Sequence, residues 1–409
     1  MKEFFKVTEL RKVLELAAGF PRVSTETVAL EETTGRILAA DVVSDVDLPD
    51  FTRSTMDGYA VRASSTFGAT EGNPAYLTVV GSVSMGESPD VTVGAGEAAR
   101  ISTGGMLPEG SDSTVMIEYA EPIDDTTIEV YKSVAPGQHV LLKGEDIRKG
   151  DVMLRCGRKL RPQETGLLAA FGKVTVVVYK KPVIGIISTG DEVVPANEIP
   201  GRGRIRDINT HTLSGLVVEA GAVPVTYGIV RDNFDVLFEK CSQALEASDM
   251  VLISGGSSVG TRDFTIEVLS ALPDAHILVH GIPISPGKPT ILARARDRAF
   301  WGLPGHVVSA MIVFDVVVRP FIEHIGGRSA EDKKEIRITA RLSRNVSSAQ
   351  GRTDYVRVKL IEKDGCLWAE PILGKSGLIN TMVKADGLIE IGMNTEGLDK
   401  GADVAVKLL

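Results

Sequence analysis

A scarcity of cysteine and of long apolar runs sets the first limits on this chain. Its three cysteines, Cys156, Cys241 and Cys366, lie far apart and form no CxxC pair, which argues against a disulfide framework and a zinc site. No stretch reaches the roughly 18 apolar residues that a membrane helix needs. Glu3 and Glu9 stand where a signal peptide would carry a basic head and an apolar run. We therefore expect a cytoplasmic protein with no membrane partner.

The charge balance excludes a further class of partner. The formal net charge is −9, so bulk attraction to nucleic acid or to acidic membranes is not expected. The chain has 409 residues, of which 43% are hydrophobic, and this is enough for about two to four folded domains. It contains no sequence repeat and no low-complexity tract.

The N-terminal region, residues 1–180, has a mixed pattern that predicts mostly β structure. It opens with a helical stripe of apolar residues, for which Thr8 is the expected cap. Short apolar runs between glycine, proline and serine clusters follow, including one over 114–119, and they predict strands. We expect a β-rich domain over about 27–144, with about 1–26 and 145–180 forming a helical and extended linker domain.

The middle region, residues 181–327, alternates short buried strands with helices. This alternation predicts a doubly wound, parallel α/β domain whose sheet is covered on both faces. The expected helices lie over 209–220, around 236–245 and over 306–325, and the expected strands over 183–187, 223–230, 250–253, 277–279, 291–293 and 299–303.

The last region, residues 328–409, follows a charged linker. Two runs in it, 336–342 and 355–361, alternate apolar and polar residues, and Lys363-Asp364-Gly365 is a turn signal. About 80 residues suffice for a small β barrel or sandwich. The predicted fold class is thus α/β and β, multidomain: a central doubly wound parallel α/β domain, flanked by a β-rich N-terminal region and a small C-terminal β barrel.

Four glycine loops of the middle region, each expected to leave a strand of the parallel sheet, are candidates for binding an anion. In parallel sheets, ligands bind beyond the carboxyl ends of the strands, where loops converge with helix N-termini. Each loop combines glycine, which lets backbone N–H groups approach an anion, with a hydroxyl, a carboxylate or a lysine. Together they predict a site for a phosphorylated ligand, although any one alone fits an ordinary turn. The loops span 189–192, 254–260, 285–289 and 303–306.

The presence of carboxylates near a phosphate-binding site needs an explanation of its own, because ionised acids repel a phosphate. They are Asp191, Glu192, Asp232 and Asp263. A hard cation between acids and phosphate removes the conflict, and Mg²⁺ suits that role. Each acid also fits a helix cap or a solvated loop residue, Asp191 above all.

Six motifs occur in order along the chain. They are Ser-Thr-Met-Asp-Gly-Tyr-Ala (54–60), Gly-Glu-Asp-Ile (144–147), Ser-Thr-Gly-Asp-Glu (188–192), Ser-Gly-Gly-Ser-Ser-Val-Gly (254–260), Pro-Gly-Lys-Pro (286–289) and Leu-Pro-Gly-His (303–306). Together they resemble the molybdopterin molybdenumtransferase (MoeA) family, which includes the C-terminal domain of gephyrin. The likeness runs from the first helix to the terminal β domain, and six ordered motifs are far more specific than one.

The resemblance implies an enzyme that inserts molybdenum from molybdate into adenylylated molybdopterin and releases AMP, assisted by Mg²⁺. It also implies elongated homodimers of four-domain subunits, with each active cleft lying between the α/β domain of one subunit and the β-rich domain of the other. Transient contact with a molybdopterin adenylyltransferase and with molybdoenzymes follows from the same resemblance.

The family's functional residues carry over by position. Glu192, Asp232 and Asp263 match acids of the α/β domain and serve as the catalytic and metal-binding set. Asp57 and Asp146 match acids contributed by the partner subunit. The expected cofactor-binding residues are Thr103, Thr189, Gly190, Ser254, Gly255, Gly256, Ser257, Ser258, Pro286, Gly287, Lys288, Pro304, Gly305 and Ser376.

The chain also departs from the family pattern. Ser285 stands where many members carry a lysine, and His306-Val307 replaces Asn-Pro. Three alternatives stay open: a tungsten-inserting relative, a molybdopterin adenylyltransferase or related nucleotide pyrophosphatase, and a non-catalytic molybdopterin-binding scaffold. The flanking β domains and the motif at Asp57 argue against the second, and the retained acids argue against the third.

Overall fold

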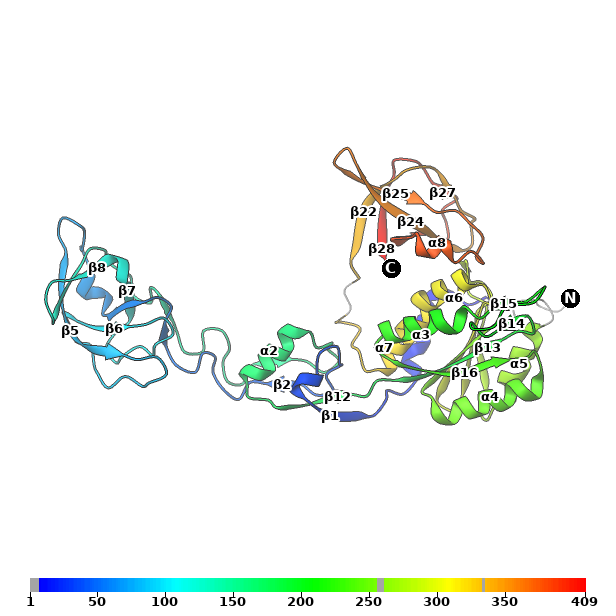
Figure 1. Ribbon diagram of the computed structural model, residues 1–409, viewed down its shortest axis with the longest axis horizontal. Helices are drawn as coiled ribbons and strands as arrows, with labels where there is room; N and C mark the ends of the chain where they lie inside the picture. Colours follow the sequence, from blue (N-terminus) through cyan, green and yellow to red (C-terminus); the bar gives the residue numbers. More distant parts are fainter. Residues whose placement is uncertain (1–6, 256–260, 333–334) are drawn as a thin grey trace. The chain divides into compact units, whose positions relative to one another are not determined.

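The computed structural model describes residues 7–255, 261–332 and 335–409. The chain forms two compact units (Figure 1). The larger unit comprises Met1–Ala40, Cys156–Ala169 and Lys173–Leu409, and the smaller unit comprises Asp41–Arg155 and Ala170–Gly172. None of the helices that the structure describes has the length and hydropathy needed to cross a bilayer.

A six-stranded sheet lies at the centre of the larger unit and confirms the predicted α/β class. The strand order is β16-β13-β17-β21-β20-β18. The first four strands are parallel, as predicted, whereas β20 and β18 are antiparallel to their neighbours. The two strands at this edge therefore depart from the parallel direction expected for the sheet. The strands are β13 (Val183–Thr189), β16 (Val223–Val230), β17 (Met250–Ser254), β18 (His276–His280), β20 (Ile291–Ala295) and β21 (Arg298–Leu303).

Helices cover both faces of this sheet. Successive side chains of β13 point to opposite faces, and because they are apolar on both, each face needs a covering layer. Ile186 joins one hydrophobic core and Ile187 joins the other. The first core includes helix α3 (Asn209–Glu219), and the second includes α4 (Phe234–Ala247) and α5 (Thr261–Ala271). Helix α5 is absent from the sequence-based expectations. The helix expected over 306–325 consists of α6 (Val307–Val313), a π-helical segment (Phe314–Val318) and α7 (Arg319–Ile325).

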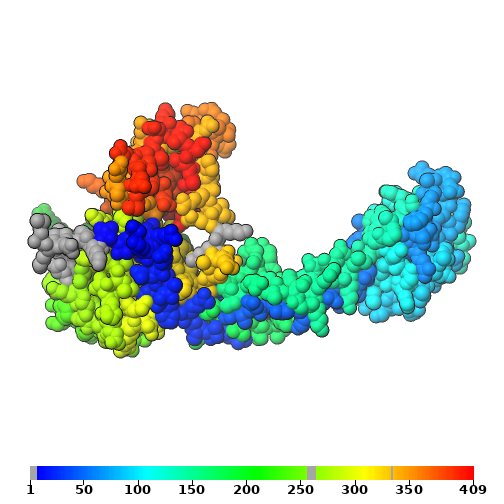
Figure 2. Space-filling model, turned by 180° about the vertical axis from the view of Figure 1, so that it is seen from behind, coloured from blue at the N-terminus to red at the C-terminus, as the bar shows by residue number. Residues whose placement is uncertain are grey.

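The first helix, α1 (Leu10–Glu15), packs on the first of these cores through Val13 and contacts the π-helical segment. Figure 2 shows the blue N-terminal segment on the surface of the larger unit. The ring of Phe20 lies 5.7 Å from that of Phe321, centroid to centroid. The expectation that Thr8 caps this helix is wrong. Glu9 occupies the N-cap position without a side-chain cap, and the N–H of Thr8 donates instead to the carbonyl of Gly281 at 3.0 Å.

A closed five-stranded barrel ends the larger unit and confirms the predicted C-terminal barrel. Its strand order is β24-β25-β22-β28-β26, and pairing of β26 with β24 closes it. The short strand β19 (Ile284–Ser285) pairs in parallel with the start of β24 and so ties the barrel to the α/β part. The barrel strands are β22 (Arg337–Leu342), β24 (Thr353–Lys363), β25 (Cys366–Pro371), β26 (Gly387–Ile391) and β28 (Asp403–Leu408).

The larger unit also contains an antiparallel pair of strands, β1 (Thr25–Ala29) and β12 (Thr175–Tyr179). The predicted helix near 162–171 is present as α2 (Pro162–Ala170). Its first turn is fixed by Glu164, which is 4% exposed and bonded to Arg158 and Arg161.

The smaller unit is built on a six-stranded sheet of order β7-β4-β6-β5-β9-β8. Its β character is as predicted, but the expected strand over 114–119 ends early, because Ile117–Tyr119 form a 3₁₀ turn. The strands are β4 (Gly58–Val61), β5 (Ala75–Val83), β6 (Glu97–Ile101), β7 (Ser113–Met116), β8 (Ala120–Pro122) and β9 (Thr127–Val130).

Candidate active site

Three of the predicted glycine loops begin side by side at one edge of the central sheet. Strand register pairs Ser188 with Ser254, and Ser254 with Leu303. The loop over 285–289 reaches the same edge differently. It enters β20 instead of leaving a strand of this sheet, and β20 begins there because Ile291 pairs with Gly302. The expectation that all four loops leave strands of one parallel sheet is wrong for this loop.

Gly255 lets the first two of these loops touch. Its φ is +136°, a conformation that side chains rarely adopt, and a Cβ atom there would overlap the carbonyl oxygen and Oγ1 of Thr189. Both residues line a cavity of about 240 Å³, which we call the glycine-loop cavity. The predicted residues that line it are Thr189, Glu192, Ser254, Gly255 and Gly305.

Asn209, which sequence reasoning missed, holds two of these loops together. Its Nδ2 donates to Ser254 Oγ at 2.7 Å and to the Gly305 carbonyl at 2.8 Å. The side chain is 9% exposed and lines the glycine-loop cavity, and its Oδ1 has no hydrogen-bond partner among the described residues. A buried acceptor without a partner is costly, so Asn209 also offers an acceptor for a ligand donor. The only sequence signal was its place at the start of a predicted helix.

Carboxylates gather beside this cavity. Partial burial raises the pKa of Asp232, and the negative charges of Asp191 and Glu192 raise it further. The negative charges of Asp191 and Glu192 therefore reach the Asp232 carboxyl group. Among the side chains that the structure describes, no three potential ligands lie close enough to hold a metal ion. Asp263 belongs to α5, but its side chain lies outside the described residues, and Gly256, Ser257 and Ser258 lie outside them entirely.

A second cavity, of about 630 Å³, lies next to the barrel. We call it the basic cavity because Lys288 and Arg352 line it and no carboxylate does among the described residues. Arg352 Nε lies 2.9 Å from Asp354 Oδ1. Hydroxyls of Ser285, Ser309 and Ser376 add donors, so the lining suits a small oxyanion. The predicted residues in it are Pro286, Gly287, Lys288, Pro304 and Ser376.

The smaller unit brings together two residues predicted for the site. Pairing of Gly58 with Ile101 in β4 and β6 places Asp57 beside Thr103, whose N–H donates to Asp57 Oδ1 at 2.7 Å. This backbone hydrogen bond, with a second from the Thr103 side chain, lowers the pKa of Asp57, which stays ionised. Asp146 is exposed in the loop after β10 (Val140–Leu141), and its N–H donates to the Leu48 carbonyl at 3.1 Å.

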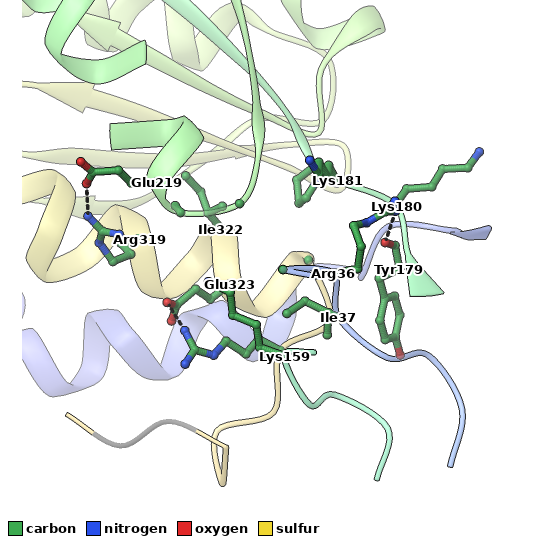
Figure 3. A pocket seen from close by; sticks show the side chains of 16 residues that line it. Arg36, Ile37, Lys159, Tyr179, Lys180, Lys181, Glu219, Arg319, Ile322 and Glu323 are labelled. Atoms are coloured by element: carbon green, nitrogen blue, oxygen red, sulfur yellow. Dashed lines mark hydrogen bonds and ion pairs between the residues drawn. The ribbon is translucent and has the colours of Figure 1, made fainter. Parts of the chain in front are cut away.

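A third cavity, of about 160 Å³, lies where α3 and α7 end near β12 (Figure 3). Several cations line it, but its arginines are paired. Arg319 bonds Glu219, and Arg328 bonds Glu323 at 2.8 Å. Arg36 is paired with Glu26. The guanidinium groups at this cavity are therefore balanced by carboxylates.

Sequence comparison covers nearly the whole chain. Residues 5–172 match the model "MoeA N-terminal region (domain I and II)", residues 185–324 match "Probable molybdopterin binding domain", and residues 339–409 match "MoeA C-terminal region (domain IV)". A molybdopterin molybdenumtransferase of Bacillus subtilis is 33% identical over 94% of this chain and 90% of its own length. The chain belongs to the MoeA family.

Solved structures of MoeA proteins agree with this assignment. The molybdopterin biosynthesis MoeA protein of Pyrococcus horikoshii is 39% identical, with a TM-score of 0.81 over 98% of this chain and 99% of that one. A second MoeA structure from the same organism is 31% identical, with a TM-score of 0.85 over 99% of this chain and 100% of that one. Two residues at which this MoeA chain departs from the motifs, Ser285 and His306, line the basic cavity.

Proposed function

We propose that this chain is a molybdopterin molybdenumtransferase of molybdenum cofactor biosynthesis. It transfers molybdenum from molybdate to adenylylated molybdopterin, and AMP is released. The observation that carries the proposal is the meeting of three glycine loops around one cavity, beside a second cavity with cations and no described carboxylate. A polyanionic substrate and a small oxyanion need these two environments.

Each of the two cavities binds a different substrate in this proposal. The glycine-loop cavity offers backbone N–H groups and hydroxyls of Thr189 and Ser254, which suit the phosphates of the adenylylated pterin. Gly256, Ser257 and Ser258 extend this loop in the sequence. The basic cavity offers Lys288, Arg352 and serine hydroxyls to molybdate. Cysteine takes no part, because the dithiolene sulfurs of the pterin bind the transferred metal.

Mg²⁺ is the cation that we propose for the acidic side of the site. The mutual repulsion of Asp232, Asp191 and Glu192 fits a cation held by one or two carboxylates together with substrate phosphates and water. Glu192 and Asp232 would hold it, with Asp263 as the third acid in the proposed set. When bound, Mg²⁺ neutralises charge that develops on the phosphates.

A second subunit completes the site in this proposal. Asp57, Thr103 and Asp146 form the part contributed by the β-rich region of the partner in a homodimer. The ionised Asp57, fixed by Thr103, gives that part a defined charge. The reaction takes place in the cytoplasm, with transient contact to a molybdopterin adenylyltransferase and to recipient molybdoenzymes.

The test is a purified assay with adenylylated molybdopterin, Mg²⁺ and either molybdate or tungstate. We expect AMP release and metal incorporation with molybdate, and loss of both when Glu192 is changed to glutamine. AMP release with tungstate alone would identify a tungsten-inserting enzyme. ATP-dependent adenylylation of free molybdopterin would favour the adenylyltransferase alternative. Inactivity with both oxyanions would refute the proposal.

A further inference from the structure

His306 lines both cavities of the candidate site, and no other described residue does so. It is exposed, directly precedes α6 and follows the Pro304-Gly305 turn. A positive charge on its imidazole would therefore act on ligands in both cavities. Imidazole is the side chain that ordinarily gains a proton between about pH 5 and 8.

The charged groups around His306 differ on its two sides. The basic cavity has two cations and no described carboxylate, so a positive imidazole would add to a binding site for anions. The glycine-loop cavity has both signs of charge. The charged groups of the basic cavity are Lys288 and Arg352, and Arg352 is paired with Asp354. Lys375 precedes Ser376 in the neighbouring loop. The charged groups of the glycine-loop cavity are Glu192, Arg206 and Asp207.

A hydrogen bond to Ser376 orients the imidazole ring of His306 at the basic cavity. Nδ1 of His306 lies 2.9 Å from Ser376 Oγ, and the N–H of Val308 donates to the Ser376 carbonyl at 3.0 Å. When the imidazole is protonated, both ring nitrogens are donors. Nδ1–H then donates to Ser376 Oγ, and the serine hydroxyl turns its own proton toward the cavity that it lines. Protonation thus makes Ser376 an oriented donor and adds a positive charge.

We propose that protonated His306 is a further oxyanion-binding residue of the basic cavity, which makes molybdate binding there dependent on pH. The inference rests on the proposed function, because molybdate is the oxyanion. Its sign follows from the charges. The imidazolium attracts the dianion, so binding is tighter at low pH and weakens as the imidazole loses its proton. By linkage, bound molybdate must hold the proton on His306 more tightly.

The first test is equilibrium dialysis of the full-length protein with molybdate, in buffers free of phosphate and sulfate. Between about pH 6 and pH 8 we expect the dissociation constant to rise about tenfold, the scale of one charged hydrogen bond. The variant His306→Asn should show the weaker binding at every pH. His211→Asn, an exposed histidine of α3 that lines neither cavity, is the matched control and should keep the wild-type profile.

The second test follows the imidazoles directly by NMR of the Cε1 resonances. The chain has six histidines, and the His306→Asn spectrum identifies the one of interest. Saturating molybdate should raise the pKa of His306 and leave that of His211 unchanged. In the double variant Ser285→Lys/His306→Asn, a fixed cation in the same cavity should restore tight binding with no dependence on pH.

The outcomes separate this inference from the proposed function. A wild-type pH profile in His306→Asn, or a His306 pKa that molybdate does not change, would overturn the inference while AMP release still supports the function. Absence of saturable molybdate binding at any pH would also overturn it. A chain that binds molybdate with the expected profile but releases no AMP would refute the proposed function alone.

Discussion

Ionisation of Asp232 costs folding stability. Burial and the charges of Asp191 and Glu192 raise its pKa, so stability falls as pH rises through that pKa and the folded chain loses its proton. In Asp232→Asn the repulsion is absent. We expect its free energy of unfolding near pH 7, measured by urea denaturation in EDTA, to rise by roughly 0.5–1 kcal/mol. The same variant should lose transferase activity.

A neighbouring acid provides the matched control for Asp232. Asp235 lies in the first turn of α4, where the helix dipole favours a negative charge. Asp235→Asn should therefore lower stability slightly, by a few tenths of a kcal/mol. Adding Mg²⁺ should stabilise the wild type and the Asp235 variant more than the Asp232 variant. If Asp232→Asn proved less stable than the wild type in EDTA, the proposed repulsion would be wrong.

Glu164 shows the opposite behaviour for a buried acid. Its carboxylate lies 2.6 Å from both Arg158 Nη2 and Arg161 Nη2. Hydrogen bonds from Arg161 above all, and from Arg158, lower the pKa of Glu164 to about 2. This stabilisation is complete above the ordinary carboxyl pKa of about 4.3 and is lost as pH falls toward 2. Glu164→Gln should lower the free energy of unfolding by about 1–3 kcal/mol at neutral pH.

The pH dependence distinguishes Glu164 from an exposed ion pair. The difference in stability between the wild type and Glu164→Gln should shrink below about pH 4. Glu219 bonds Arg319 but keeps 66% of its side chain exposed, so Glu219→Gln should change stability by less than about 0.5 kcal/mol. A constant effect of Glu164→Gln down to the acid transition would show that packing, not charge, is lost.

At the level of elements, periodicity located the strands but not their direction. The runs that form β20 and β21 are buried on both faces, which removes the alternation that marks an antiparallel hairpin. Their connection is Arg296-Asp297, with Arg296 at a φ of +49°, and not a glycine turn. Helix α5 was missed for a related reason, because its first three residues, Thr261, Arg262 and Asp263, read as loop.

The contact between the loops after β13 and β17 is another element-level feature, and it can be tested at Gly255. A side chain there would meet Thr189 in a backbone conformation that only glycine adopts readily. Gly255→Ala should therefore lower stability by about 1–3 kcal/mol and weaken binding of AMP, followed by calorimetry. Gly201→Ala is the control, because nothing lies within 4 Å of its added Cβ. Equal AMP affinity in both variants would contradict the assigned role of this contact.

For the molecule as a whole, the resemblance to a known family supplied the candidate site residues, and strand register explains how some of them come together. Asp57 and Thr103 lie 46 residues apart, and only the antiparallel pairing of β4 with β6 makes them neighbours. Asn209 could not be found in this way. Its role depends on two loops, at Ser254 and Gly305, whose approach is a property of the folded sheet and not of local sequence.

Sharing of the site between subunits is the remaining prediction at this scale. Asp57→Asn and Asp232→Asn should each inactivate the enzyme, in different halves of the proposed site. In a heterodimer of the two variants, one site carries both changes and the other carries neither, because each site takes one half from each subunit. Heterodimers isolated with two affinity tags should therefore show about half of the wild-type activity.

A matched pair of changes in one half makes this test decisive. Asp232→Asn combined with Glu192→Gln leaves every site of the heterodimer with one altered acid, so no activity should return. If the site lay within one chain, the heterodimer of Asp57→Asn and Asp232→Asn would also stay inactive, because each chain would carry one damaged site. Recovery in the first heterodimer and not in the second is expected only when the halves come from different subunits.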